Sequence, residues 1–316
     1  MSLSFNEALL IINDYLANPG KYVFPFEIKE KNKKVRKIIT YNDDENGDNL
    51  REIHTYIAKN IRGFYQSSKL SFAYKKNNCC LNAVSDHLHS NFFIKLDIKS
   101  FFETITEDKF LEHYPALFEN YGRKKRWNLF LKSVFYQSHL SIGYVTSPII
   151  SDIYLSDFDK AIEKYIKKYG PRKLHYSRYS DDILISCSGN NWTVLEGLFE
   201  KIRDELKLYS LEINEKKTQK VELNKKDQNS ITFLGLNISK NVKSLFNKNK
   251  ITVSKSYILR ILDLLEKYYD EGNKNNVFLR LRILSSIAYI EKNAYLSYNK
   301  FLKKHLNRFG KEYSGI

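Results

Sequence analysis

The tetrapeptide Tyr-Ser-Asp-Asp at residues 179–182 constrains this chain more than any other part of its sequence. It lies between two apolar, strand-like runs, 174–178 and 183–187, which predicts a tight hairpin with two adjacent carboxylates at its tip. Adjacent carboxylates repel one another unless a cation is bound to them. An Asp-Asp pair is also common in ordinary β-turns, so the tetrapeptide alone is compatible with a purely structural turn.

A third carboxylate, Asp97, ends another apolar run at residues 92–97. If the two strands lie side by side, Asp97 and Asp181 can converge on one pair of divalent metals, as two-metal phosphoryl transfer requires. Carboxylate oxygens completed by substrate phosphates suit Mg²⁺, for which Mn²⁺ is a substitute. The pattern therefore favours a pair of divalent metals.

The chain of 316 residues carries a formal net charge of +16, so a polyanionic partner is the first expectation. The charge is uneven, because residues 240–316 contain 16 Lys and Arg against 6 Asp and Glu. A Lys-rich genome would produce similar clusters without any nucleic acid, and that alternative stays open.

The three cysteines, Cys79, Cys80 and Cys187, form neither an even framework nor a CxxC motif, so no disulfide or zinc site is predicted. No signal peptide is recognisable, and the apolar runs are far shorter than the roughly 20 residues that span a bilayer. We therefore expect no membrane contact and a reducing, cytoplasmic location.

The spacing of apolar residues predicts an α+β fold. Strands are expected at 23–28, 35–39, 92–97, 174–178, 183–187, 211–213 and 231–238, and helices at 3–17, 50–64, 107–114, 124–135, 147–165, 194–209, 257–269, 277–289 and 295–309. Within 92–240, strand–helix–strand–strand–helix–strand is the order of a ferredoxin-like sheet with helices on one side. A boundary is expected near 240, where the composition turns basic, and a softer one near 90.

Five motifs follow one another along the chain. They are the Asp97 strand end with a ring five residues later, the helix-entry turn 143–148, the Tyr-Ser-Asp-Asp hairpin, the strand and following cation of 211–218, and the glycine-bearing strand 233–236. The turn offers free N–H groups to a template or nucleotide, and the glycine lets another backbone approach closely.

This order resembles motifs A to E of reverse transcriptases, and the likeness covers most of residues 30–240. In that family Tyr-x-Asp-Asp points to RNA templates and a DNA product. The chain looks most like the short bacterial enzymes, namely retron reverse transcriptases and those of phage defence and abortive infection. The resemblance implies a right-hand polymerase with fingers at 1–90, a ferredoxin-like palm at 91–240 and a basic, helical thumb at 241–316.

The same resemblance carries roles to individual residues. It implies that Asp97, Asp181 and Asp182 are catalytic, and that these residues and Ile98 bind two Mg²⁺ ions as cofactor. Residues expected to bind the incoming dNTP are Arg36, Lys34, Ser100, Phe101, Phe102, Ser147 and Lys217. Residues expected at the primer or template are Gly143, Tyr144, Thr146, Phe233, Leu234, Gly235, Lys255 and Arg260. Phe102 matches the ring that excludes a ribose 2′-OH, although a core phenylalanine would fit the sequence too.

Three features depart from the family pattern. The usual Pro-Gln-Gly before motif B is replaced by Ser-Ile-Gly at 141–143, which puts one template or dNTP contact in doubt. Retron enzymes usually carry Asn-Ala-x-x-His, but here Asn-Ala at 82–83 stands one residue too early for His87, and the Val-Thr-Gly triplet is absent at 233–235. These departures favour a related defence-type enzyme over a retron enzyme. His87 could also be a satisfied helix-end histidine.

The resemblance therefore implies an RNA-directed DNA polymerase with dNTPs as substrates and an RNA–DNA hybrid as product. It also implies an associated non-coding RNA as template and a role in defence against phage, both as hypotheses. A homo-oligomer or an effector protein is a compatible partner. Two alternatives stay open. One is a non-catalytic RNA-binding protein, against which the three intact carboxylates argue. The other is a group II intron-type maturase, against which the short basic C-terminal region argues.

Overall fold

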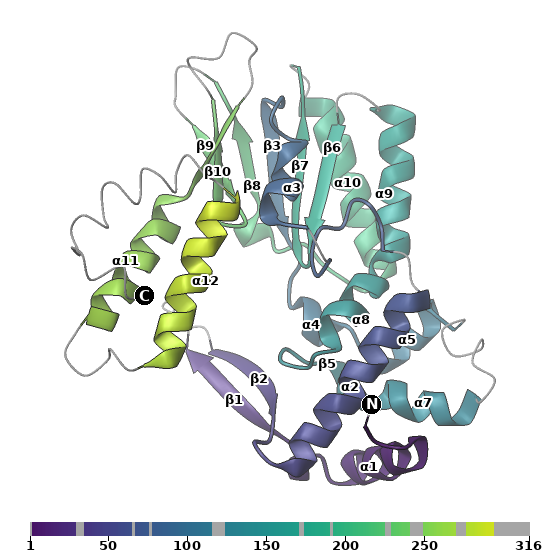
Figure 1. Ribbon diagram of the computed structural model, residues 1–316. Coiled ribbons are helices and arrows are strands. Elements are labelled where there is room, and N and C mark those ends of the chain that lie inside the picture. The colour runs from purple at the N-terminus through teal and green to yellow at the C-terminus, as the bar shows by residue number, and fades with distance from the viewer. Residues whose placement is uncertain are drawn as a thin grey trace. The chain divides into compact units, whose positions relative to one another are not determined.

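The computed structural model of the chain is drawn in Figure 1. It describes residues 2–29, 35–64, 67–75, 78–115, 124–170, 174–189, 192–224, 229–240, 249–269 and 276–293. The chain divides into two compact units, and each unit is assembled from three stretches of sequence. The first contains residues 1–74, 97–165 and 200–214, and the second contains 75–96, 166–199 and 215–316. This division by contacts differs from the consecutive fingers, palm and thumb ranges, which remain a prediction.

The first unit is mostly helical. Its elements are α1 (Phe5–Ala17), the 3₁₀ turn Pro19–Lys21, β1 (Val23–Lys29), β2 (Val35–Tyr41), α2 (Glu45–Phe64), α4 (Phe101–Thr104), α5 (Glu107–His113), α7 (Lys124–Ser133), β4 (Phe135–Tyr136), β5 (His139–Leu140) and α8 (Ser147–Tyr154). Two helices, α9 (Ser156–Tyr169) and α10 (Trp192–Leu208), continue from one unit into the other.

An aromatic core organises the first unit. It consists of Tyr15, Tyr22, Val23, Ile39, Leu50 and Tyr144. Inside it, the hydroxyls of Tyr15 and Tyr144 lie 2.7 Å apart, and the rings of Tyr41 and Tyr144 stack at 5.4 Å. The core therefore joins the N-terminal helix to the β1–β2 hairpin and to the turn that precedes α8.

The second unit contains a four-stranded sheet. The sequence predicted three of its strands, at 92–97, 174–178 and 183–187, but not the fourth, at 219–222. The elements of this unit are α3 (Cys80–Ser85), β3 (Phe92–Asp97), β6 (Leu174–Tyr179), β7 (Asp182–Cys187), the 3₁₀ turn Glu215–Lys217, β8 (Gln219–Glu222), β9 (Ser230–Phe233), β10 (Leu236–Ser239), β11 (Lys250–Val253), α11 (Lys255–Tyr269) and α12 (Val277–Asn293). The sheet order is β6-β7-β3-β8, which is the strand arrangement of a ferredoxin-like fold.

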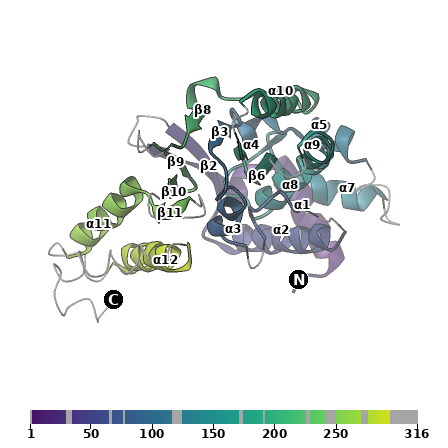
Figure 2. The same cartoon turned by 90° about the horizontal axis from the view of Figure 1, so that it is seen from above.

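Helices cover both faces of this sheet, as Figures 1 and 2 show. The start of α10 packs on one face, where the rings of Trp192 and Phe92 meet at 4.8 Å. On the other face lie α3 and the turns that follow it, from which His87 reaches β6 and β7. The sequence predicted helices on one side of the sheet, and α3 adds the second layer.

Three predicted elements differ from the structure. The helix expected at 147–165 is two helices separated at Leu155, and the strand at 231–238 is a hairpin of β9 and β10 with its turn at 234–235. At 211–213 the expected strand is reduced to a single bridge between Ile98 and Ile213. The pattern of apolar residues locates these segments. It does not predict which residues adopt the positive φ values that end a strand in a turn. The helix expected at 295–309 lies outside the described residues.

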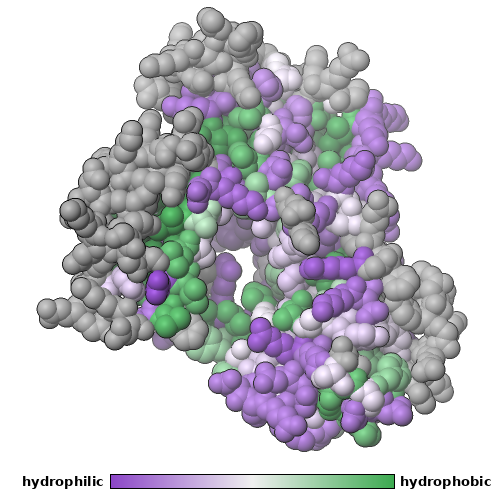
Figure 3. Space-filling model, in the orientation of Figure 1, coloured by the Kyte–Doolittle hydropathy of each residue, from purple (hydrophilic) through white to green (hydrophobic). Residues whose placement is uncertain are grey.

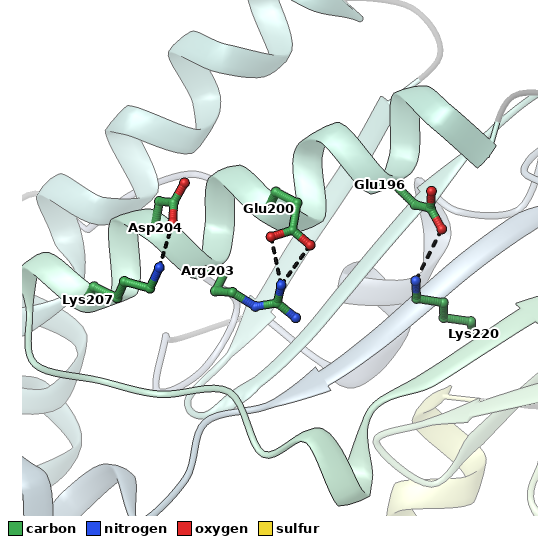
Figure 4. A network of polar contacts seen from close by, with 6 residues as sticks. All are labelled: Glu196, Glu200, Arg203, Asp204, Lys207 and Lys220. Atoms are coloured by element: carbon green, nitrogen blue, oxygen red, sulfur yellow. Dashed lines mark hydrogen bonds and ion pairs between the residues drawn. The ribbon is translucent and has the colours of Figure 1, made fainter.

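The exposed side of α10 is charged, as Figure 4 shows. Arg203 pairs with Glu200, and Lys207 pairs with Asp204. Lys220 of β8 pairs with Glu196 at 3.2 Å. Exposed pairs of this kind each contribute about 0–1 kcal/mol to the free energy of unfolding, so this side of the helix is a solvated surface.

The two C-terminal helices carry exposed apolar side chains. In Figure 3 hydrophobic atoms gather over α12, where Val277 and Leu281 are more than half exposed. No helix within the described part of the chain is long and apolar enough to cross a membrane.

Candidate active site

The Tyr-Ser-Asp-Asp tetrapeptide forms the tip of the β6–β7 hairpin, as the sequence predicted. Tyr179 ends β6 and pairs with Asp182, the first residue of β7, so Ser180 and Asp181 make the turn. Ser180 has a φ of 61°, a left-handed conformation that costs energy for most residues with a Cβ atom. Both aspartates are half-buried.

A buried arginine lies beside this turn. Arg178 in β6 is fully buried, and its guanidinium donates a hydrogen bond of 3.3 Å to the carbonyl of Ser180. A guanidinium stays protonated in proteins, so it places a permanent positive charge next to two acidic residues. Nothing in the apolar pattern of the strand distinguishes this buried arginine from an exposed one.

His87 ties the two strands of the hairpin together. Its Nδ1 lies 2.7 Å from the hydroxyl of Ser186 in β7, and its Nε2 lies 3.0 Å from the hydroxyl of Ser177 in β6. The ring is fully buried, and burial lowers the pKa of His87 to about 3. Both ring nitrogens of His87 therefore have hydrogen-bond partners inside the protein. This environment fits the structural role that the sequence analysis left open.

Asp97 ends β3, the strand next to β7 in the sheet. Asn91, just before β3, donates its backbone N–H to the carbonyl of Cys187 at the end of β7, at 3.0 Å, so the two strands run antiparallel. Hence β3 ends at the edge of the sheet at which β7 begins. The two strands thus lie side by side in the sheet, which the sequence analysis left as a condition.

Asn214 is a site residue that the sequence argument did not identify. Its side-chain amide donates a hydrogen bond of 3.3 Å to a carboxylate oxygen of Asp97. Its backbone N–H donates to the Asp97 carbonyl at 2.8 Å, and Lys99 donates to the Glu212 carbonyl at 2.9 Å. Asp97 is 9 % exposed, so the Asn214 amide donates to a nearly buried carboxylate. An Asn directly after a short strand was the available signal.

The two phenylalanines after Asp97 have different environments. Ser100 adopts a φ of 47° and opens the short helix α4. Phe101 is 3 % exposed and belongs to the core, whereas Phe102 is half-buried with its ring centroid 5.5 Å from that of Phe101. The side chain of Phe101 is therefore part of the core. Phe102 stays partly exposed, as a contact with a nucleotide would require.

The turn before α8 is fixed by β2. Ile39 donates its backbone N–H to the Ile142 carbonyl at 2.8 Å, and Val145 donates to the Tyr41 hydroxyl at 3.2 Å. Gly143 has a φ of 115°, and a Cβ atom there would lie 2.2 Å from the Ile39 carbonyl oxygen. This close approach explains the glycine.

The side chains around that glycine face the interior. Tyr144 is 2 % exposed, and Thr146 and Ser147 are buried as well. The Ser147 hydroxyl donates to the Ser141 carbonyl at 2.6 Å. The ring of Tyr144 belongs to the aromatic core. The primer, template and dNTP contacts expected of Tyr144, Thr146 and Ser147 stay predictions.

The turn at 234–235 is held by the C-terminal helices. Tyr289 of α12 donates its hydroxyl to the Leu234 carbonyl and also bonds to the Cys80 thiol. Cys80 bonds in turn to Tyr179 of the hairpin. Gly235 has a φ of 78°, and a Cβ there would lie 3.3 Å from atoms of both Tyr257 and Tyr289.

The remaining predicted residues lie on more open parts of the chain. Arg36 is exposed in β2, Lys217 is exposed in its 3₁₀ turn, and Lys255 is exposed at the start of α11. Arg260 lies over the ring of Tyr257, 5.7 Å from its centroid. Phe233 is fully buried, so its ring is unavailable to a primer strand, and Lys34 lies outside the described residues.

The oxygen ligands fit a divalent metal by type. Asp97 is nearly buried and accepts a hydrogen bond from the Asn214 amide, and Asp181 and Asp182 are adjacent at a turn. In the part of the chain that the structure describes, no group of three or more His, Cys, Asp or Glu side chains is arranged to hold a metal. Carboxylate oxygens are of the ligand type that hard divalent cations prefer.

Comparisons with known proteins agree on one family. Residues 28–238 match the family described as reverse transcriptase (RNA-dependent DNA polymerase). The chain is 28% identical to the retron Ec86 reverse transcriptase of Escherichia coli over 206 residues, which are 65% of this chain and 60% of that protein. It is also 28% identical to the retron Ec83 reverse transcriptase of Escherichia coli, over 69% of this chain and 68% of that protein.

Solved structures support the same fold. Telomerase from Candida albicans, solved with a fragment of telomeric RNA, superposes with a TM-score of 0.52 at 13% identity, over 94% of this chain and 60% of that one. The Candida tropicalis counterpart gives a TM-score of 0.51 at 13% identity, over 95% of this chain and 59% of that one. At these identities the likeness concerns the right-hand fold alone. The curated relatives are retron enzymes, although the sequence departures favoured a related defence-type enzyme.

Proposed function

This chain belongs to the reverse transcriptase family, and we propose that it is itself an RNA-directed DNA polymerase. The single observation that carries the proposal is the pairing of β3 with β7, which brings the strand ending in Asp97 to the sheet edge that carries the Asp181-Asp182 turn. An unused site has no reason to keep three acids at one edge of a sheet, because like charges raise the free energy of the fold.

Asp97 and Asp181 are the proposed ligands of two Mg²⁺ ions, with Asp182 in support and the Ile98 carbonyl beside them. When bound, these metals would lower the pKa of the primer 3′-OH and neutralise charge on the triphosphate. The chain's own residues orient the reaction. Asn214 holds one oxygen of Asp97 by a hydrogen bond of 3.3 Å, and the Arg178 guanidinium stabilises the turn that carries the other acids.

The fingers, palm and thumb ranges 1–90, 91–240 and 241–316 are part of the proposal. Phe102 would contact the sugar of the incoming dNTP, and Arg36 and Lys217 would contact its triphosphate. The turn at Leu234-Gly235 would support the primer strand through its backbone. Lys255 and Arg260 are exposed cations on α11 that suit phosphate contacts.

Primer extension on an RNA template tests the activity. Wild-type protein with Mg²⁺ and dNTPs should produce DNA, and Asp181→Ala should abolish the product. Asp204→Ala is the matched control, because Asp204 lies in an exposed ion pair on α10. Synthesis that survives Asp181→Ala would reject the proposed site. Absence of product on any template, with the protein folded, would favour an RNA-binding protein.

We also propose that the template is a dedicated non-coding RNA and that the enzyme acts in phage defence in the cytoplasm. The similarity to retron reverse transcriptases supports the first part, and three free cysteines suit a reducing compartment. Sequencing of co-purified nucleic acid should give one dominant structured RNA, and random cellular RNA would count against it. Phage protection that persists in Asp181→Ala would reject a defence role for the DNA product.

A further inference from the structure

A cavity of about 200 Å³ lies in the first unit. Its walls come from three places in the sequence: β2, α4, and the β4–β5 hairpin with the two residues that follow it. The volume equals roughly seven water molecules, enough for one small planar group. Two of its lining residues, Ser141 and Ile142, stand where the family has Pro-Gln.

The cavity opens on the opposite face of β2 from the proposed triphosphate contact. Lys37 and Ile39 line it, and successive side chains of a strand point to opposite faces. Arg36 therefore faces away from it. The cavity is thus a separate location from the nucleotide site proposed for Arg36.

The floor is apolar and one wall is aromatic. Ile39 and Leu140 are buried at the base, and Ile142 lines the same side. The ring of Tyr136 is half-buried, with the ammonium group of Lys37 positioned 5.9 Å from its centroid. A floor of this kind favours a flat, partly apolar ligand.

The rim offers donors and acceptors that have no partner among the described residues. The Glu103 carboxylate and the Gln137 amide make no hydrogen bond or ion pair with any of them. His139 donates from Nδ1 to the Glu103 carbonyl at 2.7 Å, so in the neutral ring its Nε2 is an acceptor. Gln137 is presented at the hairpin turn, where its φ is 51°.

We infer that this cavity binds an unpaired nucleobase carrying an exocyclic amino group, presented by single-stranded RNA. The amino group would donate to the Glu103 carboxylate, and Lys37 would donate to a ring nitrogen or carbonyl of the same base. Proteins that read RNA commonly take unstacked bases into pockets with an aromatic wall and hydrogen-bond their edges. The inference rests on the proposed function only for the identity of RNA as the source of the base.

A phosphate group fits the cavity less well. Glu103 and the acceptor nitrogen of His139 would both repel an anion, and Lys37 is the one cation among the lining residues. A nucleobase satisfies acceptors and donors together, since its edge carries both. The donors and acceptors at the rim and the apolar floor therefore both favour a nucleobase.

The test compares adenosine with purine riboside, the same nucleoside without its 6-amino group. Ligand-observed NMR titration of the full chain should give an affinity for adenosine at least about tenfold higher, because hydrogen bonds to charged groups are the strong ones. Glu103→Ala should bring the ratio of the two affinities close to one, and Glu112→Ala, an exposed Glu on α5, should leave it unchanged. A ratio near one in the wild type, or an unaltered ratio in Glu103→Ala, overturns the inference.

A second variant covers the case in which Glu103→Ala fails to fold. Lys37→Gln should weaken both nucleosides together, because both keep the ring nitrogens. Single-stranded RNA with one adenosine replaced by purine riboside should show the same discrimination in filter binding. Discrimination confined to free nucleosides would reject RNA as the source. None of these measurements needs DNA synthesis, so loss of polymerase activity and loss of this site are distinguishable.

Discussion

Asn214 donates a hydrogen bond from its side-chain amide to the Asp97 carboxylate, and its backbone N–H donates to the Asp97 carbonyl. Two bonds from one residue fix both the backbone and one oxygen of a nearly buried acid. Asn214 is therefore a positioning residue of the proposed site.

Asn214→Ala should raise the Mg²⁺ concentration for half-maximal primer extension by about tenfold, since a hydrogen bond to a charged group is worth about 1.5–3 kcal/mol. The melting temperature should change little, because the residue follows a strand at a turn. Glu212→Gln is the control, since Glu212 forms an exposed pair with Lys99. An unchanged metal requirement would show that the amide does not position the acid.

Phe101 and Phe102 should respond in opposite ways to truncation. Phe102→Ala should increase the use of rNTPs relative to dNTPs by about tenfold, equivalent to about 1.4 kcal/mol, because the ring no longer excludes a 2′-OH. Phe101→Ala should instead lower the free energy of unfolding by about 3–5 kcal/mol, because it empties a core position. Competition between labelled rNTP and dNTP measures the first effect, and urea denaturation measures the second. Equal sugar selection by wild type and Phe102→Ala would reject the gate.

Gly143→Ala should abolish DNA synthesis or folding. The added Cβ would lie 2.2 Å from the Ile39 carbonyl oxygen, and φ is 115°. Gly189→Ala is the matched control, with a φ of 94° and no atom within 4 Å of an added Cβ. It should cost about 1–3 kcal/mol from backbone strain alone. Denaturant midpoints of both variants separate the clash from the strain, and equal midpoints would contradict the close approach to β2.

The protein should lose stability as pH falls from 7.5 to 5. Burial lowers the pKa of both His54 and His87 to about 3, whereas an unfolded histidine titrates near 6.5. Below 6.5 the unfolded chain binds protons that the folded chain does not, so the loss reaches about 2 kcal/mol per histidine at pH 5. Urea midpoints across this range measure it, and His87→Asn should reduce the slope. A slope of zero would mean that neither ring is buried in its neutral form.

The hairpin and three strands of the sheet were predictable from sequence, because the runs before Asp97 and around Asp181 are short and apolar. The fourth strand, β8, has no comparable apolar run and was missed. The ferredoxin-like order then fixes which strands are neighbours.

Tertiary contacts without a local pattern could not be predicted. Tyr144 follows a glycine like a ligand-binding residue, yet its ring completes a core built from segments far away in the sequence. Arg178 is fully buried although its side chain is charged. Asn214 bonds to Asp97, which lies 117 positions away in the sequence. Periodicity reports the face on which a residue lies, and it does not report the partner that it finds there.

The proposed site requires Asp97 and Asp181 to bind the same pair of metal ions. Electron paramagnetic resonance of Mn²⁺ in the presence of primer, RNA template and dNTP counts the ions bound per chain. We predict two bound ions in the wild type and in Asp204→Ala, and the loss of at least one in Asp97→Ala and in Asp181→Ala alike. Full Mn²⁺ occupancy in either of these two variants would contradict a shared site.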